Sequence, residues 1–151
     1  MGLKGKLLRQ IEISFHGDVF HEIYRDRPHH VPSMCPIVVG VEGQWGTVGS
    51  IIIWKFTHDG ETKTASEVIE SIDDEKKMMK FRVIGGDDVL EYYKSFIITY
   101  QVDTNSDGNF VSWSIEYEKL KEEIPEPLTY LELLLNITKD IDNHHAKLLN
   151  P

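Results

Sequence analysis

The chain has 151 residues and a formal net charge of −9, and 40% of its residues are hydrophobic. This length and composition fit a globular protein, so we expect residues 1–151 to fold as a single domain. An acidic surface repels phosphate backbones, and no cluster of lysine and arginine offsets that repulsion, which argues against nucleic acid as a partner. The single cysteine, Cys35, excludes an internal disulfide and a zinc site of the CxxC type.

No window of the sequence approaches the ~18 apolar residues that a membrane-spanning helix needs. The first six residues, Met1–Lys6, lack the apolar stretch of a signal peptide. We therefore expect a cytoplasmic protein without a membrane span.

The N-terminal part predicts one strand followed by two short helices. Residues 11–15 alternate between apolar and polar side chains, which is the period of a half-buried strand. Asp18 is expected to cap a short helix, and Pro28 ends it. A second short helical segment is expected between Pro28 and Pro36. Neither helix is long enough to be stable alone, so both must pack on another element.

The middle of the chain predicts six further strands, separated by turns such as Asp59-Gly60. Consecutive strands joined by short turns are antiparallel neighbours. Their alternation makes one face apolar and the other charged, and a sheet of this width twists, so its apolar face needs a cover. The six expected strands span residues 37–41, 50–57, 63–72, 77–84, 96–102 and 111–117.

The C-terminal segment predicts that cover. From Pro127 to Leu149 no glycine or proline interrupts a helical pattern. Leu133 falls with the polar side chains of this helix and Ile137 on the border between the two faces. The expected fold class is therefore α+β, with a seven-stranded curved antiparallel sheet around one long helix. The residues expected on the buried face, within about 140° of arc, are Leu131, Leu134, Leu135, Thr138, Ile141, Asp142, His145, Leu148 and Leu149.

A series of motifs runs along nearly the whole chain: Glu42–Ser50, Trp54, Thr57–Gly60, Glu91–Lys94, Trp113–Lys119, Pro125–Pro127 and Thr138–Asp142. In this order they resemble the plant major latex proteins, within the superfamily of the birch pollen allergen Bet v I. The resemblance implies a helix-grip fold whose cavity takes small hydrophobic plant metabolites, including steroid-like or hormone-like compounds. It also implies a role in defence and stress responses.

The inward-facing side chains are ordinary core by their pattern alone, since apolar stripes mostly mark packing. The resemblance implies that some of them line a ligand-binding cavity, because one helix over a curved sheet leaves space. The candidates for the cavity are Phe20, Ile23, Met34, Trp54, Phe56, Met79, Phe81, Val83, Phe96, Ile98, Tyr100, Trp113, Ile115, Tyr117, Leu131, Leu135, Thr138 and Asp142.

A Gly-rich loop contains Gly43, Trp45, Gly46 and Gly49. A phosphate-binding loop would continue into a helix, whereas residues 51–54 have strand character, which argues against phosphate. Two readings remain open: a tight connection that needs positive φ, and a mobile lid over a cavity with Trp45 as its apolar tip.

Three polar residues, Thr138, Asp142 and His145, share the buried face of the predicted helix. A buried carboxylate needs a partner, so Asp142 and His145, three residues apart, are expected to form a structural pair. The alternative is that they anchor a hydroxyl group of a ligand.

No metal or other cofactor is expected, because the neighbouring histidines at 29–30 and 144–145 point about 100° apart on a helix. The superfamily includes enzymes that condense or isomerise alkaloid precursors with a cavity lysine, tyrosine and carboxylates, so a lysine or a tyrosine–carboxylate pair inside the cavity would favour an enzyme. Here the lysines that can be placed, Lys63, Lys80, Lys94 and Lys119, fall on polar faces or strand ends.

The leading hypothesis is a non-enzymatic binder or carrier of small hydrophobic molecules. The first alternative is an isomerase or condensing enzyme on the same scaffold. The second is an interaction protein, because Ile51–Ile53 put apolar side chains on both faces of one strand. A strand bulge would explain these isoleucines equally well. A monomer or weak dimer is expected.

Overall fold

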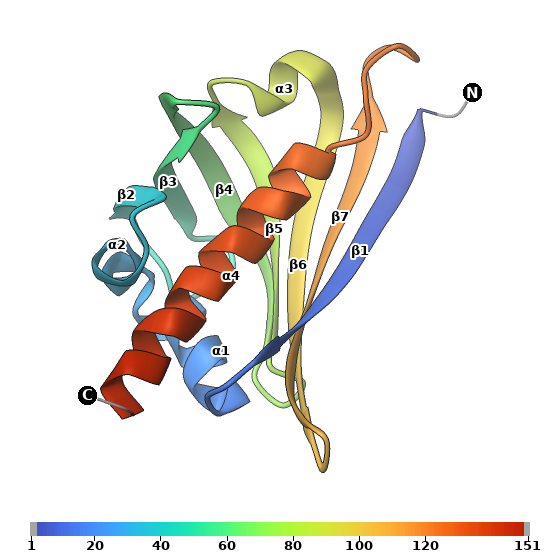
Figure 1. Ribbon diagram of the computed structural model, residues 1–151. Helices are drawn as coiled ribbons and strands as arrows, with labels where there is room; N and C mark the ends of the chain where they lie inside the picture. Colours follow the sequence, from blue (N-terminus) through green and yellow to red (C-terminus); the bar gives the residue numbers. More distant parts are fainter. Residues whose placement is uncertain (1–2, 150–151) are drawn as a thin grey trace.

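The computed structural model describes residues 3–149, and a seven-stranded antiparallel sheet forms its frame. The strand order is β1-β7-β6-β5-β4-β3-β2, so β2 to β7 follow one another as a meander and β1 closes on β7. Figure 1 shows how strongly the sheet curves. The strands are β1 Lys4–Ile13, β2 Val38–Gly43, β3 Ile51–His58, β4 Glu61–Asp73, β5 Met78–Gly86, β6 Tyr93–Asn105 and β7 Gly108–Lys119.

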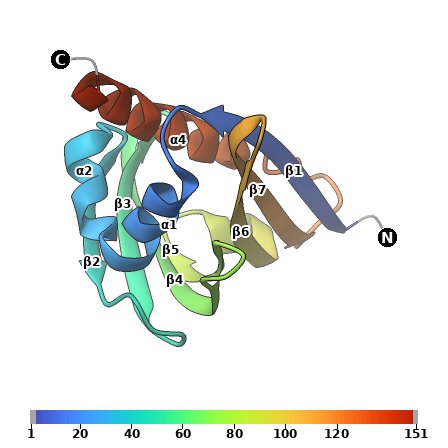
Figure 2. The ribbon, with the colours of Figure 1, turned by 90° about the horizontal axis from the view of Figure 1, so that it is seen from below.

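The long helix α4 crosses the concave side of the sheet, while α1 and α2 close one end of it (Figures 1 and 2). The predicted helix-grip fold is thereby confirmed. The short helix α3 follows β5 and was not predicted. No helix among residues 3–149 is long and apolar enough to cross a membrane. The helices are α1 Gly17–Asp26, a 3-10 turn Pro28–His30, α2 Val31–Met34, α3 Val89–Tyr92 and α4 Leu128–Leu149.

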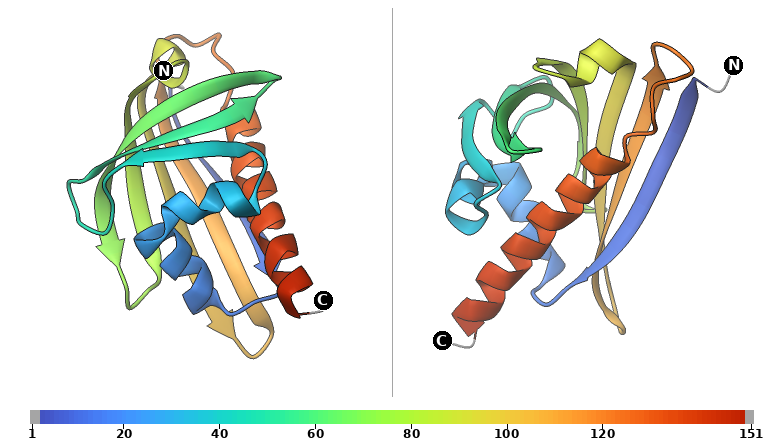
Figure 3. Two further views of the ribbon diagram at one scale, coloured as in Figure 1. Left: turned by 90° about the vertical axis from the view of Figure 1, so that its left-hand side faces the viewer. Right: turned by 45° about the horizontal axis from the view of Figure 1, so that its top comes forward.

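Turn chemistry and bulges shape the sheet. Asp59 and Gly60 both have positive φ, 52° and 77°, and form the predicted two-residue turn between β3 and β4. Within residues 3–149 four register shifts interrupt the ladders, one between β2 and β3, two between β4 and β5 and one between β6 and β7. Each bulge bends its strand and increases the local twist. The result is the curl around α4 that both views of Figure 3 show.

The bulge that would explain the three isoleucines is absent from β3, so that explanation is wrong. The pairing of β3 with β4 runs without a shift along the whole of β3. Ile52 is fully buried on the inner side, whereas Ile51 is 47% exposed on the outer side. The apolar side chain outside is therefore a real feature of this strand.

Helix α1 is capped differently from the expectation. His16 is the N-cap residue, and its Nδ1 accepts a hydrogen bond from the Asp18 backbone N–H at 3.1 Å. The Asp18 carboxylate instead pairs with Lys77 at 2.6 Å. The imidazole of His21 ties the helix to the sheet, with Nδ1 2.7 Å from the Tyr100 hydroxyl and Nε2 2.7 Å from an Asp74 carboxylate oxygen.

The far end of α4 is fixed to the end of β1. Asp142 accepts hydrogen bonds from the backbone N–H and the hydroxyl of Ser14, both at 2.7 Å. His145 stacks on the ring of Phe15 with centroids 4.2 Å apart. Asp142 and His145 are therefore structural, but each has its own partner, so the predicted pair between them is wrong. Leu148 is also not on the buried face, because it is 66% exposed.

We expect Asp142→Ala to lower the free energy of unfolding by about 1–3 kcal/mol, because the N–H and hydroxyl of Ser14 lose a charged acceptor. Urea denaturation followed by circular dichroism measures this. Asn143→Ala on the exposed side of the same helix is the control and should change stability by less than about 0.5 kcal/mol. Equal effects of the two substitutions would contradict the anchoring role of Asp142.

Candidate functional site: a cavity between sheet and helix

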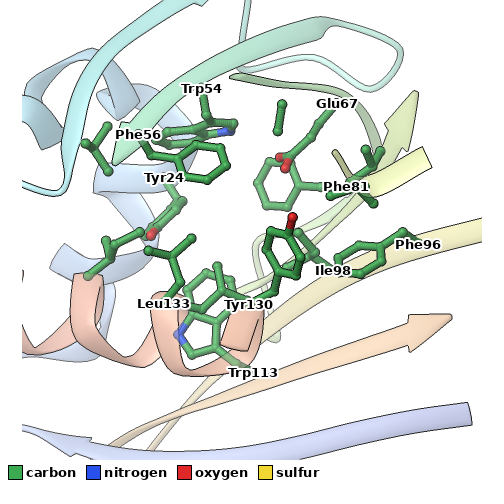
Figure 4. A pocket seen from close by; sticks show the side chains of 16 residues that line it. Tyr24, Trp54, Phe56, Glu67, Phe81, Phe96, Ile98, Trp113, Tyr130 and Leu133 are labelled. Carbon is green, nitrogen blue, oxygen red and sulfur yellow. The ribbon is translucent and has the colours of Figure 1, made fainter. Parts of the chain in front are cut away.

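The concave side of the sheet is not completely filled. Between the sheet, α1 and the first half of α4 lies a cavity of about 70 Å³ (Figure 4). A cavity of this size holds roughly five water molecules. Its walls are almost entirely aromatic and aliphatic. They consist of Tyr24, Val38, Trp54, Phe56, Ala65, Glu67, Phe81, Val83, Val89, Phe96, Ile98, Trp113, Tyr130, Leu133, Leu134 and Ile137.

The structure brings seven of the sequence candidates together around this cavity. They are Trp54, Phe56, Phe81, Val83, Phe96, Ile98 and Trp113. They come from β3, β5, β6 and β7, where inward and outward side chains alternate as expected. The other eleven candidates do not line it: Phe20, Ile23, Met34, Met79, Tyr100, Ile115, Tyr117, Leu131, Leu135, Thr138 and Asp142.

Aromatic packing explains why the α1 end of the sheet is closed. The Phe20 ring stands edge-on to Tyr100 at 5.5 Å and to Trp113 at 6.4 Å, and Tyr24 lies 5.2 Å from Tyr100. These rings fill the space between α1 and the sheet. Strand periodicity gives the inward direction of Tyr100, but it does not reveal that a helix covers that position.

The orientation of α4 explains the second group of differences. The stripe with Leu131, Thr138 and Ile141 is buried, and α4 packs on β1 and β7. On this side the indole N–H of Trp113 donates to the Thr138 hydroxyl at 2.9 Å. The cavity instead meets the stripe with Leu133 and Ile137, roughly 100° further round the helix. The predicted placement of Leu133 with the polar side chains is therefore wrong.

Glu67 is the one carboxylic acid of the cavity wall, and the sequence analysis did not single it out. It lies on β4 between the inward-facing Ala65 and Ile69, directly across from Ile52 on β3. An acidic residue at an inward position of an alternating strand is the signal that would have found it. The side chain is only 7% exposed, and Figure 4 shows its carboxyl group directed into the cavity.

A bulge lies on the neighbouring strand beside this side chain. Ser66 pairs with Gly85 and Glu67 with Val83, so Ile84 is an extra residue of β5 opposite the Ser66–Glu67 step. Bulges of this kind commonly redirect a side chain next to a binding site.

Burial makes the Glu67 carboxyl group hard to ionise. Loss of water raises its pKa to about 8, and hydrogen bonding to Trp54 lowers the pKa only in part. No lysine, arginine or histidine lines the cavity in the described part of the chain. At neutral pH the acid is therefore mostly protonated and uncharged.

Two tyrosines supply the remaining hydroxyl groups of the wall. Burial raises the pKa of Tyr24 and, to a lesser extent, that of Tyr130, so both hydroxyls are uncharged. Tyr130 stacks on His58 with ring centroids 4.9 Å apart. All ionisable groups of the wall are thus neutral hydrogen-bond donors near pH 7.

Lys63 lies near the start of β4, which agrees with the expected position at a strand end. Its side chain is 15% exposed and forms an ion pair with Asp88, which has an exposed fraction of 26%. The hydrogen bond to Asp88 raises the pKa of Lys63. A lysine amine that attacks a carbonyl needs a lowered pKa instead.

The Gly-rich loop adopts the positive φ expected of a tight connection. Gly43, Gly46 and Gly49 have φ of 99°, 88° and 93°. A Cβ on Gly43 would come within 2.3 Å of the Ile51 carbonyl oxygen. Trp45 stacks on the ring of His29 at 4.9 Å, which places the loop against the short helical segments. The strand β3 follows this loop, as predicted.

No group of three or more histidine, cysteine, aspartate or glutamate side chains is arranged for a metal within residues 3–149. Cys35 is buried, and its thiol lies 3.3 Å from an Asp140 carboxylate oxygen. Burial raises the pKa of this thiol to about 11.

A curved sheet, a helix held across it and an apolar cavity between the two define a helix-grip protein. The model of the pathogenesis-related protein Bet v 1 family matches residues 2–148. The chain belongs to this family, as the sequence motifs predicted.

Major latex proteins are similar along nearly the whole chain. MLP-like protein 31 of Arabidopsis thaliana is 44% identical over 148 residues, which cover 94% of this chain and 86% of the relative. MLP-like protein 28 of the same plant is 43% identical over 148 residues, 94% of this chain, but the chain spans only 44% of its length. A crystal structure of major latex-like protein 151 from Panax ginseng is 44% identical with a TM-score of 0.91, covering 95% of this chain and 99% of the other.

The fold also occurs in an enzyme. Norcoclaurine synthase from Thalictrum flavum, solved in complex with dopamine and hydroxybenzaldehyde, has a TM-score of 0.76 at 21% identity. The match covers 98% of this chain and 88% of the enzyme. At this identity the similarity shows a shared fold and nothing about the reaction.

We expect the stability gain from Glu67→Gln to depend on pH. The folded pKa of Glu67, about 8, lies above the ordinary value of 4.5. The folded state therefore binds a proton between these values that the unfolded state releases, and wild-type stability falls as pH rises. The free energy of unfolding of Glu67→Gln relative to wild type should increase by roughly 2–4 kcal/mol from pH 4.5 to pH 8.

Urea unfolding at several pH values measures this difference. The matched control is Glu116→Gln on the exposed outer face of β7, whose difference from wild type should be nearly flat over the same range. A flat profile for Glu67→Gln as well would mean that Glu67 is solvated in the folded protein.

Proposed function

We propose that this protein is a non-enzymatic binder or carrier of small hydrophobic molecules, which occupy the cavity between the sheet and α4. The observation that carries the proposal is the cavity wall, in which aromatic and aliphatic side chains from α1, α4 and six strands surround unfilled space. Ligand sites in proteins are concave, mostly apolar and furnished with a few polar groups. Membership of the Bet v 1 family supports the same function.

The volume limits the ligand. A cavity of about 70 Å³ accepts a flat molecule of one or two rings with little rearrangement. A steroid requires α4 or the Gly-rich loop to move outward. Because cores are closely packed, such a displacement costs contacts that the ligand must replace. We therefore place compact aromatic metabolites ahead of steroids among the ligand classes implied by the sequence.

The enzymatic alternative has two observations in its favour: the acid Glu67, which has a pKa suited to proton transfer near neutral pH, and the tyrosines Tyr24 and Tyr130 in the same wall. The chemistry considered for the superfamily also uses a cavity lysine, and no lysine lines this cavity in the described part of the chain. Lys63, with a side chain that is 15% exposed, is engaged with Asp88. Binding without catalysis therefore remains the proposal. We also propose that the protein takes part in defence and stress responses, lies in the cytoplasm and is a monomer or weak dimer.

We expect Ala65→Leu to weaken binding of a compact hydrocarbon, 2-ethylnaphthalene, at least tenfold. Ala65 lines the cavity and is 6% exposed, so the larger side chain occupies the space that the ligand needs. Binding is followed by NMR through the indole N–H signals of Trp54 and Trp113, which both line the cavity.

Thr62→Leu is the control, because Thr62 is exposed and belongs to the same strand. It should bind like wild type. Failure of the wild-type protein to bind any compact aromatic molecule would overturn the proposed function. Unchanged affinity of Ala65→Leu would place the ligand elsewhere.

A further inference from the structure

The Glu67 carboxyl group is out of keeping with its surroundings. Its neighbours on β4 and the facing residues are apolar, with Ala65 and Ile69 on either side and Ile52 opposite. Phe81 and Val83 approach from β5. A carboxyl group in such a place is costly unless it is hydrogen-bonded, and an apolar side chain of similar volume would pack without that cost.

The fold does not use all of the hydrogen-bonding capacity of the Glu67 carboxyl group. Two other buried polar side chains are each engaged twice: Thr138 accepts from Trp113 and donates to the Leu134 carbonyl, and His21 contacts both Tyr100 and Asp74. Among the described residues the indole of Trp54 is the group that lowers the pKa of Glu67, against the burial that raises it. The oxygen atoms of the acid therefore retain bonding capacity toward the cavity, into which Figure 4 shows them pointing.

We propose that Glu67 is the specificity-determining residue of the cavity and donates a hydrogen bond to uncharged, mostly apolar ligands that carry a carbonyl or hydroxyl oxygen. This inference rests on the proposed function, since it names the ligand class of the same cavity. The carboxyl O–H meets the ligand oxygen, and the hydroxyls of Tyr24 and Tyr130 are further donors on the wall.

Charge excludes the other ligand classes. An anionic ligand finds no lysine, arginine or histidine on the described wall to balance its charge. A cationic amine requires Glu67 to lose its proton in apolar surroundings, and burial opposes this by raising the pKa to about 8. A hydrocarbon enters the cavity but leaves the acid without its partner.

Four ligands that share one ring system separate these classes. They are 2-acetylnaphthalene, the hydrocarbon 2-ethylnaphthalene, the anion 2-naphthoate and the cation 2-(aminomethyl)naphthalene. At pH 7 the wild-type protein should bind the ketone about tenfold more tightly than the hydrocarbon, as one satisfied buried hydrogen bond predicts. Both charged ligands should bind more weakly than the ketone. Calorimetry and the Trp54 and Trp113 indole signals report the affinities.

Two variants test the role of Glu67. Glu67→Gln retains an N–H donor of the same size and should keep the preference for the ketone. Glu67→Met removes the donor and should bind the ketone and the hydrocarbon equally. The matched control Glu116→Met, on the outer face of β7, should keep the wild-type preference. Above pH 8 the wild-type preference for the ketone should fall, because Glu67 loses the proton that it donates. Tyr24 and Tyr130, the other ionisable groups of the described wall, remain neutral there, so the fall reports on Glu67.

Each result decides between the ideas. Equal binding of ketone and hydrocarbon by the wild-type protein overturns this inference and leaves the proposed function intact. Tightest binding of the amine overturns it in favour of an ion pair. A preference for the ketone that survives in Glu67→Met assigns the donor role to another group and also overturns it. Binding of none of the four ligands overturns the inference together with the proposed function.

Discussion

A single helix cannot fill the concave side of a seven-stranded sheet, and the place where that helix is held decides where empty space remains. Helix α4 is fixed toward β1 and β7. Thr138 receives the indole N–H of Trp113, and Asp142 receives two donors from Ser14 at the end of β1. With α4 attached to this edge, its other flank faces β3 to β6 across a gap. The cavity is therefore a consequence of how α4 is anchored.

The second anchor, formed by α1, closes the end of the sheet near the contact between Asp142 and Ser14. Helix α1 brings Phe20 and Tyr24 against Tyr100 and Trp113, and His21 links the helix to both β6 and the β4–β5 turn. Aromatic rings are large and rigid, so a few of them fill this end completely. Trp113 takes part in both anchors, since its ring packs on α1 and its N–H bonds to α4. The binding site is what remains between these two packed regions.

Local sequence rules predicted the fold well because each strand and turn carries its own signal. Alternation along Val111–Tyr117, the Asp59-Gly60 turn and the uninterrupted segment up to Leu149 each fix one element without reference to the others. The rotation of α4 depends on tertiary contacts instead. The helical projection placed Leu131 on the buried face and Leu133 with the polar side chains, and only tertiary contacts such as the hydrogen bond of Thr138 show which stripe meets β7 and which meets the cavity. The residues that the strands contribute to the cavity wall were therefore predicted partly correctly. The predicted face of α4 is rotated by about 100° from the face that meets the cavity.

Glu67 escaped prediction for a related reason. Its direction depends on the parity of β4, and a bulge at Ile84 shifts the neighbouring strand beside it. Once it is known which residues of β4 point inward, Glu67 conflicts with the apolar pattern around it. Such conflicts are found mostly at functional sites, where the loss of stability is offset elsewhere in the protein. The fold tolerates the acid by keeping its proton. That proton makes the cavity neutral and supplies a hydrogen-bond donor. The buried carboxyl group of Glu67 therefore lowers the stability of the folded state as pH rises, and at neutral pH it suits the cavity to an uncharged ligand oxygen.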